Sequence, residues 1–552
     1  MEPGTGNTPA PAEENKGPSK NALKKAQKEK EKAEKAAKRA AEEAERKRAA
    51  EANDASKADY GELGVLDDPN IPEGVPIKSL PELKDEGDVI FQAQVDNARS
   101  QSANLAFVIF KDQGETLQAV VAKSETISKQ MVKFSSGIPA ESVVLVHATI
   151  TKPQDPVKSC SIQTIEAHVK KIFVTSKADV QLPLQVADSE QPVYAEGEEP
   201  SQEEEAARPI VGLAVRLNNR VIDLRARQNQ AIMTVRHGVK RLFREFFEAR
   251  NFQEIETPKL LGASSEGGAN VFEVTYFNKK AYLAQSPQLY KQMLIAAGKP
   301  GVFEIGPVFR AENSNTARHL TEFVGLDMEM PFVNNYHEVV SLLEELMLFI
   351  FNGLGKRYSK AVEVVRSVYN VPEFKLPEAG KVPRLAFSEG IQMLREAGEK
   401  IEDYEDLSTP QEKKLGALVL EKYGSDFYVL DKFPLGIRPF YTMPDKETYN
   451  KTSDPNAGYS NSYDFFMRGQ EIMSGAQRIH QADFLEKRMR EHVTPVDPES
   501  PGLKDYVNAF RAGCPRHAGG GLGLDRIVML YLGLPNIRLA SLFPRDPQRL
   551  AP

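Results

Sequence analysis

The stretch VFEIGPVFRAENSNTARHLTEFVGLDMEM, residues 302–330, consists of two runs of alternating residues separated by a polar segment. Alternation predicts a hairpin of two β-strands, because successive side chains of a strand point to opposite faces. The face predicted to be core holds Phe303, Ile305, Phe309, Leu326, Met328 and Met330. The opposite face holds Glu304, Gly306, Val308, Arg310, Glu312, Phe323, Asp327 and Glu329. A face with charges of both signs suits the floor of a site for a ligand that is both cationic and anionic, and the alternative is a solvated outer face.

Everything that follows Arg216 is predicted to form one large α+β domain. Apolar residues at helical spacing predict one helix over 228–250 and a second over 336–353. The hairpin of residues 302–330 lies between them in the sequence. The domain is therefore expected to combine a sheet with flanking helices, over residues 216–552.

Upstream of this domain the pattern changes to short β-like runs. Five of them, at 88–99, 104–113, 116–123, 142–152 and 165–176, occur in about a hundred residues. This density predicts a small Greek-key barrel of the OB type, which we assign to residues 75–180. The Pro-containing, acidic stretch at 181–215 is predicted to be a hinge between the two domains.

The first 74 residues are predicted to be a disordered or basic helical extension. Between Lys16 and Arg48 there are 13 basic and 6 acidic residues, so a net charge of −7 for the chain conceals a basic arm on an acidic body. Strong helix formers dominate this stretch, and four of its lysines cluster at helical spacing. A solvated or disordered charged tail is one interpretation, and a clamp on a phosphate backbone is the other. The clustered lysines are Lys20, Lys24, Lys25 and Lys28.

The composition also limits the compartment. No stretch approaches the roughly 18 apolar residues that span a bilayer, and the first residues contain no apolar region typical of a secretory signal. Cys160 and Cys514 are the only cysteines, too few for a disulfide framework. We therefore expect a cytoplasmic protein without a membrane partner.

Three segments, in this order, resemble the signature motifs of class II aminoacyl-tRNA synthetases. FFEARNFQEIETPKL at 246–260 is similar to motif 1, FRAEN with RHLTEF at 309–323 to motif 2, and GGGLGLDR at 519–526 to motif 3. The resemblance implies a catalytic domain with an antiparallel β-sheet flanked by helices. It also implies a homodimer whose interface is formed by motif 1, with Pro258 at its centre.

Further segments resemble the aspartate-specific members of that family. SSEGG at 264–268 is similar to a loop that closes on bound aspartate, and AQSPQLYKQ at 284–292 and SGAQR at 474–478 complete the set. A carboxylate side chain in a desolvated pocket needs paired cations, for which Lys291 and Arg478 are the candidates. The residues that the resemblance assigns to L-aspartate are Glu266, Gln288, Lys291, Arg310, Asp327, Ser474 and Arg478.

The resemblance also implies an ATP site, with Arg310, Glu312 and Arg526 as the catalytic residues. Arg310 would bridge the attacking carboxylate and the α-phosphate, and Phe323 and Arg526 would enclose the adenine. The residues assigned to ATP are Arg310, Glu312, Arg318, His319, Leu320, Phe323, Glu471, Gly523, Asp525 and Arg526. Asp525 stands where many eukaryotic relatives carry Glu. Magnesium prefers oxygen ligands, and its expected ligands are Glu471, Ser474 and Asp464.

In the predicted barrel, Phe107, Gln118 and Glu166 occupy positions at which this family reads the anticodon. Aromatic stacking and base-edge hydrogen bonds are how OB surfaces hold splayed bases, although Phe107 could equally be a core residue of LAFVIF. The basic arm resembles the tRNA-binding arm of lower-eukaryote, fungal-like enzymes. That likeness favours the clamp interpretation.

The expected activity is that of an aspartate–tRNA ligase, which forms aspartyl-adenylate from ATP and L-aspartate and transfers it to tRNA(Asp). One alternative is a non-discriminating or asparagine-type synthetase of the same subclass. A second is a catalytically silent RNA-binding paralogue, which predicts damaged motifs. A third, an ammonia-dependent asparagine synthetase, has no use for a barrel and a basic arm.

Overall fold

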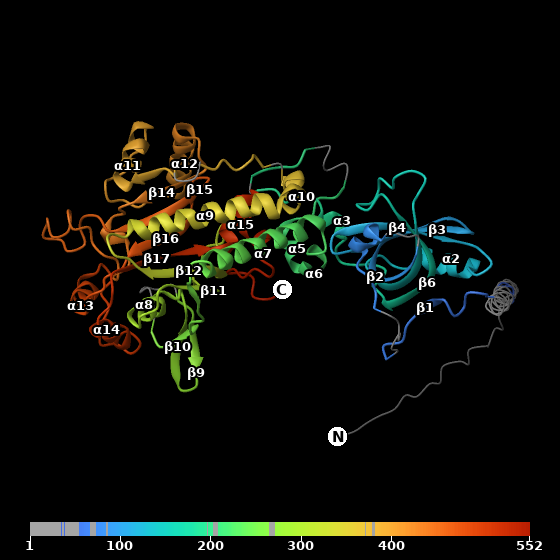
Figure 1. Ribbon diagram of the computed structural model, residues 1–552, viewed down its shortest axis with the longest axis horizontal. Coiled ribbons are helices and arrows are strands. Elements are labelled where there is room, and N and C mark those ends of the chain that lie inside the picture. Colours follow the sequence, from blue (N-terminus) through green and yellow to red (C-terminus); the bar gives the residue numbers. More distant parts are fainter. Residues whose placement is uncertain are drawn as a thin grey trace, which may run out of the picture. The chain divides into compact units, whose positions relative to one another are not determined.

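The computed structural model divides the chain into two compact units, Met1–Leu182 and Pro183–Pro552 (Figure 1). The residues that it describes are 32, 35, 38, 54–66, 73–83, 87–195, 197–201, 208–263, 271–369, 371–377 and 381–552. The four lysines of the arm and Glu266 lie outside these residues. None of the described helices combines the length and hydropathy needed to cross a bilayer.

The first unit is built around a β-barrel. Its described strands follow the order β1-β6-β4-β3-β2-β5, and a further pairing between β5 and β6 closes the sheet. Side chains of β3 alternate between buried and half-buried, so every second residue enters the barrel core. The barrel confirms the predicted OB-type fold. Its elements are β1 (Tyr60–Glu62), η1 (Ile77–Glu82), β2 (Asp88–Ser102), β3 (Leu105–Asp112), β4 (Glu115–Ala122), α2 (Lys129–Ser136), β5 (Val143–Thr151) and β6 (Glu166–Ser176).

The second unit is organised on a large sheet. Among the described residues it has eight strands in the order β13-β14-β15-β16-β17-β12-β11-β7, antiparallel except for the outer pairs β13–β14 and β11–β7. The predicted hairpin is confirmed as β11 and β12, which pair from Val302–Glu329 to Phe309–Glu322. The strands are β7 (Gln253–Glu254), β11 (Val302–Phe309), β12 (Glu322–Pro331), β13 (Arg384–Ala386), β14 (Phe427–Asp431), β15 (Ser462–Met467), β16 (Gln470–Gln477) and β17 (His517–Gly523).

Helices cover one face of this sheet, and the apolar core lies between them and the strands (Figure 1). α7 (Arg227–Glu248) and α9 (His337–Arg357) match the two predicted helices to within a few residues. Their buried stripes pack on the core face of the hairpin, where Phe303, Leu326 and Met328 are fully buried. The prediction of an α+β domain with an antiparallel sheet flanked by helices is therefore confirmed.

Shorter elements surround the sheet. β8 (Leu260–Leu261), β10 (Lys279–Leu283) and β9 (Glu273–Tyr276) form a small separate sheet. The remaining elements of the unit are α3 (Val186–Ser189), α5 (Leu213–Asn218), α6 (Arg220–Asp223), α8 (Gln288–Ala296), α10 (Ser359–Tyr369), α11 (Phe387–Glu396), α12 (Thr409–Tyr423), η2 (Leu435–Ile437), α13 (Ala482–Glu491), α14 (Lys504–Arg511), α15 (Leu524–Leu532) and η3 (Ile537–Ala540).

Candidate active site

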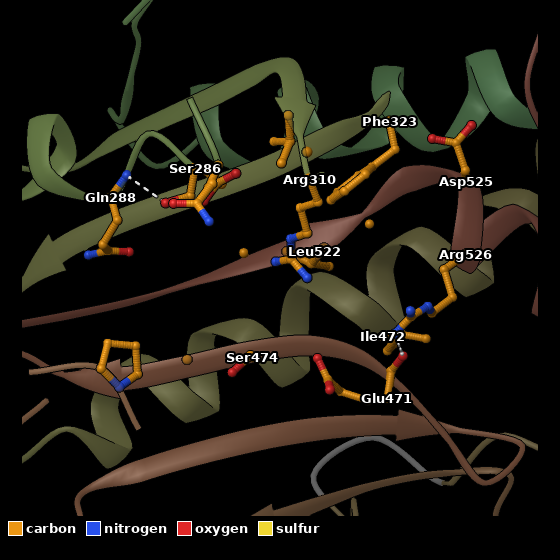
Figure 2. A pocket seen from close by; sticks show the side chains of 18 of the residues that line it. Ser286, Gln288, Arg310, Phe323, Glu471, Ile472, Ser474, Leu522, Asp525 and Arg526 are labelled. Atoms are coloured by element: carbon orange, nitrogen blue, oxygen red, sulfur yellow. Dashed lines mark hydrogen bonds between the residues drawn. The ribbon is translucent and has the colours of Figure 1, made fainter. Parts of the chain in front are cut away.

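A pocket lies on the face of the sheet that the core helices leave uncovered. Strands β11, β12, β16 and β17 supply its floor, and the first turn of α15 closes one end (Figure 2). The polar face of the predicted hairpin faces this pocket, so it is not a solvated outer face. The predicted residues that line it are Gln288, Arg310, Glu312, Arg318, His319, Leu320, Phe323, Asp327, Glu471, Ser474, Arg478, Gly523, Asp525 and Arg526.

The glycine run of β17 leaves space in the middle of the floor. Gly521 pairs with Ser474 on one side and Asp327 on the other. A Cβ at Gly521 would lie 2.9 Å from the Asp327 carboxylate, and one at Gly519 would lie 2.3 Å from Glu329 Oε2. Any larger residue would therefore collide with the carboxylates of β12. The glycines keep both carboxylates in place and the floor open.

One end of the pocket is aromatic and cationic. Arg310 lies over the ring of Phe323, with 5.5 Å between the guanidinium carbon and the ring centroid. Arg526 faces the same region from α15 and donates from Nη1 to the Glu471 carbonyl at 3.0 Å (Figure 2). Burial lowers the pKa of His319, and the charges of Arg318 and Arg526 lower it further, so this imidazole is neutral at neutral pH. The arrangement suits a flat base beside several phosphates.

The opposite end contains a buried cluster of four charges. Lys291 Nζ lies 2.9 Å from Asp327 Oδ1 and 3.7 Å from Glu329 Oε2. Arg478 donates from Nε to Glu329 Oε1 at 3.0 Å. Glu329 is fully buried, and the charges of Arg478 and Lys291 hold its pKa below the usual range against the effect of burial. The two cations and two anions thus stabilise one another.

Arg478 is the cation of this cluster that reaches the pocket, whereas Lys291 does not line it. Nη2 of Arg478 donates to Gln288 Oε1 at 3.1 Å and to the Gly519 carbonyl at 3.0 Å. With Nε bound to Glu329, Nη1 makes no hydrogen bond to the part of the chain that the structure describes. One donor group of a rigidly held guanidinium therefore remains for a ligand.

The predicted metal ligands lie on two neighbouring strands. Glu471 and Ser474 of β16 both face the pocket (Figure 2). Asp464 of β15 is buried instead, and its Oδ2 accepts from Arg438 Nη2 at 2.6 Å. Arg438 Nη1 also donates to the Ser474 hydroxyl at 2.8 Å, so Asp464 acts on Ser474 through this arginine. Burial raises the pKa of Asp464 to about 6, although Arg438 opposes the shift.

Among the residues of the site that the sequence did not indicate are two charged ones. Glu329 binds both buried cations, and its signal was its place beside Asp327 on the charged face of the hairpin. Arg438 lines the pocket from the segment after η2, and no periodicity or motif pointed to it. It also lies over the ring of Phe433, at 4.0 Å from the centroid.

A further carboxylate, Glu412, approaches the pocket from α12. Ser408 and Gln411 form a capping box that begins this helix, and Gly424 ends it in the left-handed conformation. Glu412 in the first turn lies 3.5 Å from Arg318 Nη1, and Arg318 Nη2 donates to Thr409. Burial raises the pKa of Glu412 to about 7, and the charge of Glu471 adds to the shift.

This shift predicts a pH-dependent gain in stability for Glu412→Gln. Because the pKa of about 7 in the folded protein exceeds the ordinary glutamate pKa of 4.5, stability is lost as pH rises between these values. A difference of this size corresponds to about 3 kcal/mol at most. Urea unfolding should show the variant to be more stable than the parent at pH 8.5 and similar to it near pH 5. The matched control is Glu421→Gln, an exposed position on the same helix, and an equal gain at both pH values would contradict the prediction.

The three predicted anticodon residues lie on the outside of the barrel. Phe107 is half-buried on β3 between the core residues Ala106 and Val108, and Arg99 lies over its ring at 5.3 Å. Gln118 Nε2 donates to Glu166 Oε1 at 2.5 Å, which joins β4 to β6. The barrel thus presents an aromatic ring and a polar pair on one outer surface.

The segment around Pro258 is held from within the domain. Thr257 donates to Glu304 Oε2 at 2.7 Å, and Lys259 Nζ donates to Glu304 Oε1 at 2.5 Å. Between these anchored neighbours Pro258 itself is exposed, and Leu260 is 50% exposed. An apolar surface on a rigid segment suits an interface.

Comparisons with known proteins agree with this geometry. A family model described as tRNA synthetases class II (D, K and N) matches residues 212–547. The human cytoplasmic aspartate–tRNA ligase is 48% identical over 91% of this chain and 96% of its own length, and the Caenorhabditis elegans enzyme is 47% identical over 90% and 91%. The solved aspartyl tRNA synthetase of Entamoeba histolytica, 44% identical, superposes with a TM-score of 0.77 over 90% of this chain and 96% of its own. With the segments similar to motifs 2 and 3 lining one pocket and the family model matching most of the chain, the chain belongs to the class II tRNA synthetases of the aspartate, lysine and asparagine group.

Proposed function

We propose that the pocket activates L-aspartate with ATP and passes the aspartyl group to the 3′ end of tRNA(Asp). The chain is an aspartate–tRNA ligase, an AMP-forming aminoacyl-tRNA synthetase of the kind its relatives represent. The observation that carries the proposed chemistry is the pocket itself, which has an aromatic, arginine-rich end and a charge-paired end on one floor. The motif residues of the pocket are intact, which disfavours a silent paralogue.

Activation needs no general base, because the α-carboxylate of an amino acid, with a pKa of about 3.5, is already ionised at neutral pH. The residues must align the carboxylate with the α-phosphorus and neutralise the charge that develops there. We assign this task to Arg310, which lines the pocket beside Phe323. Phe323 and Arg526 hold the adenine, and Arg318 with the neutral His319 binds the terminal phosphate.

Glu471 and Ser474 fit a magnesium site. Both offer hard oxygen atoms to the pocket, and Mg²⁺ in nucleotide sites usually takes one or two carboxylates together with the phosphates. When bound, Mg²⁺ would neutralise phosphate charge. Asp464, whose carboxylate is bonded to Arg438, orients Ser474 from behind. Glu312 adds a carboxylate near the nucleotide.

Selection of aspartate is assigned to Arg478 and Lys291. The free Nη1 of Arg478 binds the side-chain carboxylate of aspartate, and Lys291 fixes Asp327, whose carboxylate then faces the substrate ammonium. Gln288 keeps the guanidinium oriented, and Glu266 completes the site from outside the described residues. Asparagine offers an amide in place of the carboxylate, so it gives Nη1 only a neutral acceptor and loses the charge-assisted hydrogen bond.

The other parts of the chain are assigned as follows. Residues 1–74 form a tRNA-binding arm, 75–180 the anticodon-binding barrel, 181–215 the linker and 216–552 the catalytic domain. Exposed Pro258 and Leu260 support a homodimer through this segment. The named cytoplasmic relatives support a cytoplasmic location.

The direct test is aspartate-dependent ATP–pyrophosphate exchange, with asparagine and lysine as controls. We expect exchange with aspartate and little with the other two amino acids. Exchange with asparagine at a similar rate would favour the asparagine-type alternative. Its absence with every amino acid would overturn the proposed activity.

Phe107→Ala should weaken tRNA binding without changing amino acid activation. Stacking of one base on an aromatic ring contributes about 1–3 kcal/mol, so the KM for tRNA should rise by roughly 5- to 150-fold. The side chain is outside the barrel core, and stability should change little. Aminoacylation kinetics measure the effect, with pyrophosphate exchange as the internal control. A loss of exchange equal to the loss of aminoacylation would place Phe107 in the fold instead.

A further inference from the structure

A buried ion pair connects the core helix α7 to the edge of the nucleotide pocket. Arg236 Nη2 of α7 lies 3.1 Å from Asp525 Oδ1 of α15, with 10% and 2% of the two side chains exposed. Asp525 lines the pocket, whereas Arg236 lies behind it. In Figure 2 the Asp525 carboxylate points away from Arg526 and towards the green helix above it. The pair thus joins the interior of the domain to the site.

The second oxygen of this carboxylate makes a different contact. Asp525 Oδ2 accepts from the backbone N–H of Val324 on β12 at 3.2 Å. Val324 follows Phe323, and Asp525 precedes Arg526. One carboxylate therefore connects the strand that carries Phe323 to the helix turn that carries Arg526, and these are the two walls assigned to the adenine.

This link depends on a nearby cation. Burial raises the pKa of Asp525, and the charge of Arg236 opposes that shift. Without Arg236 the carboxylate would be left in a desolvated position with Lys240 as the next contributing cation. It would then take up a proton or turn towards the pocket, and the spacing of the two walls would no longer be fixed.

We propose that Arg236 is a positioning residue for the adenine base, which it controls through Asp525 and the Val324 amide. The inference rests on the proposed function, because it takes the adenine to lie between Phe323 and Arg526. It adds Arg236 of α7, which does not line the pocket, to the residues that set the affinity for ATP. A buried ion pair by itself is weak evidence for stability, and the contact of the same carboxylate with the Val324 amide supports a positioning role.

The test separates the base from the phosphates. Arg236→Met should raise the KM for ATP about tenfold in pyrophosphate exchange, while the KM for aspartate changes less than twofold. Adenosine, as a competitive inhibitor, should bind about tenfold more weakly, and inorganic tripolyphosphate should inhibit as before. The matched control is Arg241→Met, since Arg241 lies on the same helix with its side chain 59% exposed. A parallel loss of adenosine and tripolyphosphate affinity would overturn the proposal and indicate general damage.

A double variant guards against a folding defect. In Arg236→Met with Asp525→Asn the amide can still accept from Val324 but carries no charge, so adenosine affinity should recover relative to Arg236→Met alone. If Arg236→Met does not fold, the double variant and Arg236→Lys are measured in its place. A double variant that folds but binds adenosine tenfold more weakly than the parent contradicts the proposed role of Arg236. Phe323→Ala separates a failure of the adenine assignment from a failure of the role proposed for Arg236. If it leaves adenosine affinity unchanged, the adenine assignment itself is wrong; if it weakens adenosine while Arg236→Met does not, the role of Arg236 alone is wrong.

Discussion

Arg310→Ala should lower the rate of aspartate-dependent pyrophosphate exchange by at least about 10²–10³-fold, the usual cost of losing one donor that stabilises transition-state charge. Arg310 is exposed at the end of β11, and it forms no ion pair with the described residues of the free protein. Its charge is therefore available to the substrates. Because it would contact the α-phosphate most strongly as charge develops, kcat and kcat/KM should fall together.

Arg310→Lys is the matched variant for this prediction. Lysine keeps the positive charge but lacks the planar fork that contacts carboxylate and phosphate together, so it should recover only part of the lost rate. Thermal unfolding should be almost unchanged in both variants, since Arg310 is exposed and its described contact is with the ring of Phe323. Exchange within fivefold of the parent for Arg310→Ala would exclude a role at the α-phosphate.

The hairpin shows how far sequence alone reaches in this protein. Two-residue alternation placed Phe303 and Met328 in the core and Arg310 and Asp327 on the pocket side, because the pleat of a strand fixes which side chains share a face. Apolar residues at helical spacing located α7 and α9 in the same way, because the period of a helix fixes which of its side chains share a face. The prediction of an OB-type barrel followed from strand density, and the structure confirms it.

The alternation of residues along a strand does not indicate which residues a side chain contacts on the neighbouring strands. Asp464 was expected to bind metal, but its register neighbour is Ser474, and its carboxylate is bonded to Arg438, which joins the site from 26 residues upstream. Lys291 lies behind Asp327 for a similar reason, since α8 packs beneath β12. Such partners are set by tertiary packing, so no local pattern could have indicated them.

The glycine run at 519–521 could be recognised from the sequence but not explained from it. As a motif it identified the family, but its physical reason became visible in the sheet, where Gly519 and Gly521 face Glu329 and Asp327. A side chain there would displace a carboxylate or fill the pocket floor. Glycine is therefore needed in this motif because the carboxylates of Asp327 and Glu329, almost two hundred residues earlier in the chain, occupy the space above it.

Arg478→Lys is the second change with a large expected effect, and it acts on the amino acid. Arg478 holds Glu329 with Nε, holds Gln288 and the Gly519 carbonyl with Nη2, and has Nη1 left for the substrate. An ammonium group cannot keep this set of directions from one position. We expect the KM for aspartate to rise by roughly 10²–10³-fold, which corresponds to about 3–4 kcal/mol of lost binding free energy. The KM for ATP should change little.

The companion variant is Arg478→Met combined with Glu329→Gln, which removes both charges of the pair. It should fold better than Arg478→Met alone, because no carboxylate is left unpaired beside Lys291, and yet it should remain unable to use aspartate. Exchange assays with aspartate and asparagine, together with thermal unfolding, separate the two effects. If the double variant regained aspartate affinity, Arg478 would serve only to neutralise Glu329, and selection of the carboxylate would have to come from Lys291. If only its stability returns, then the guanidinium that keeps the cluster folded is also the group that recognises the substrate, and a single side chain connects the stability of this pocket to its choice of amino acid.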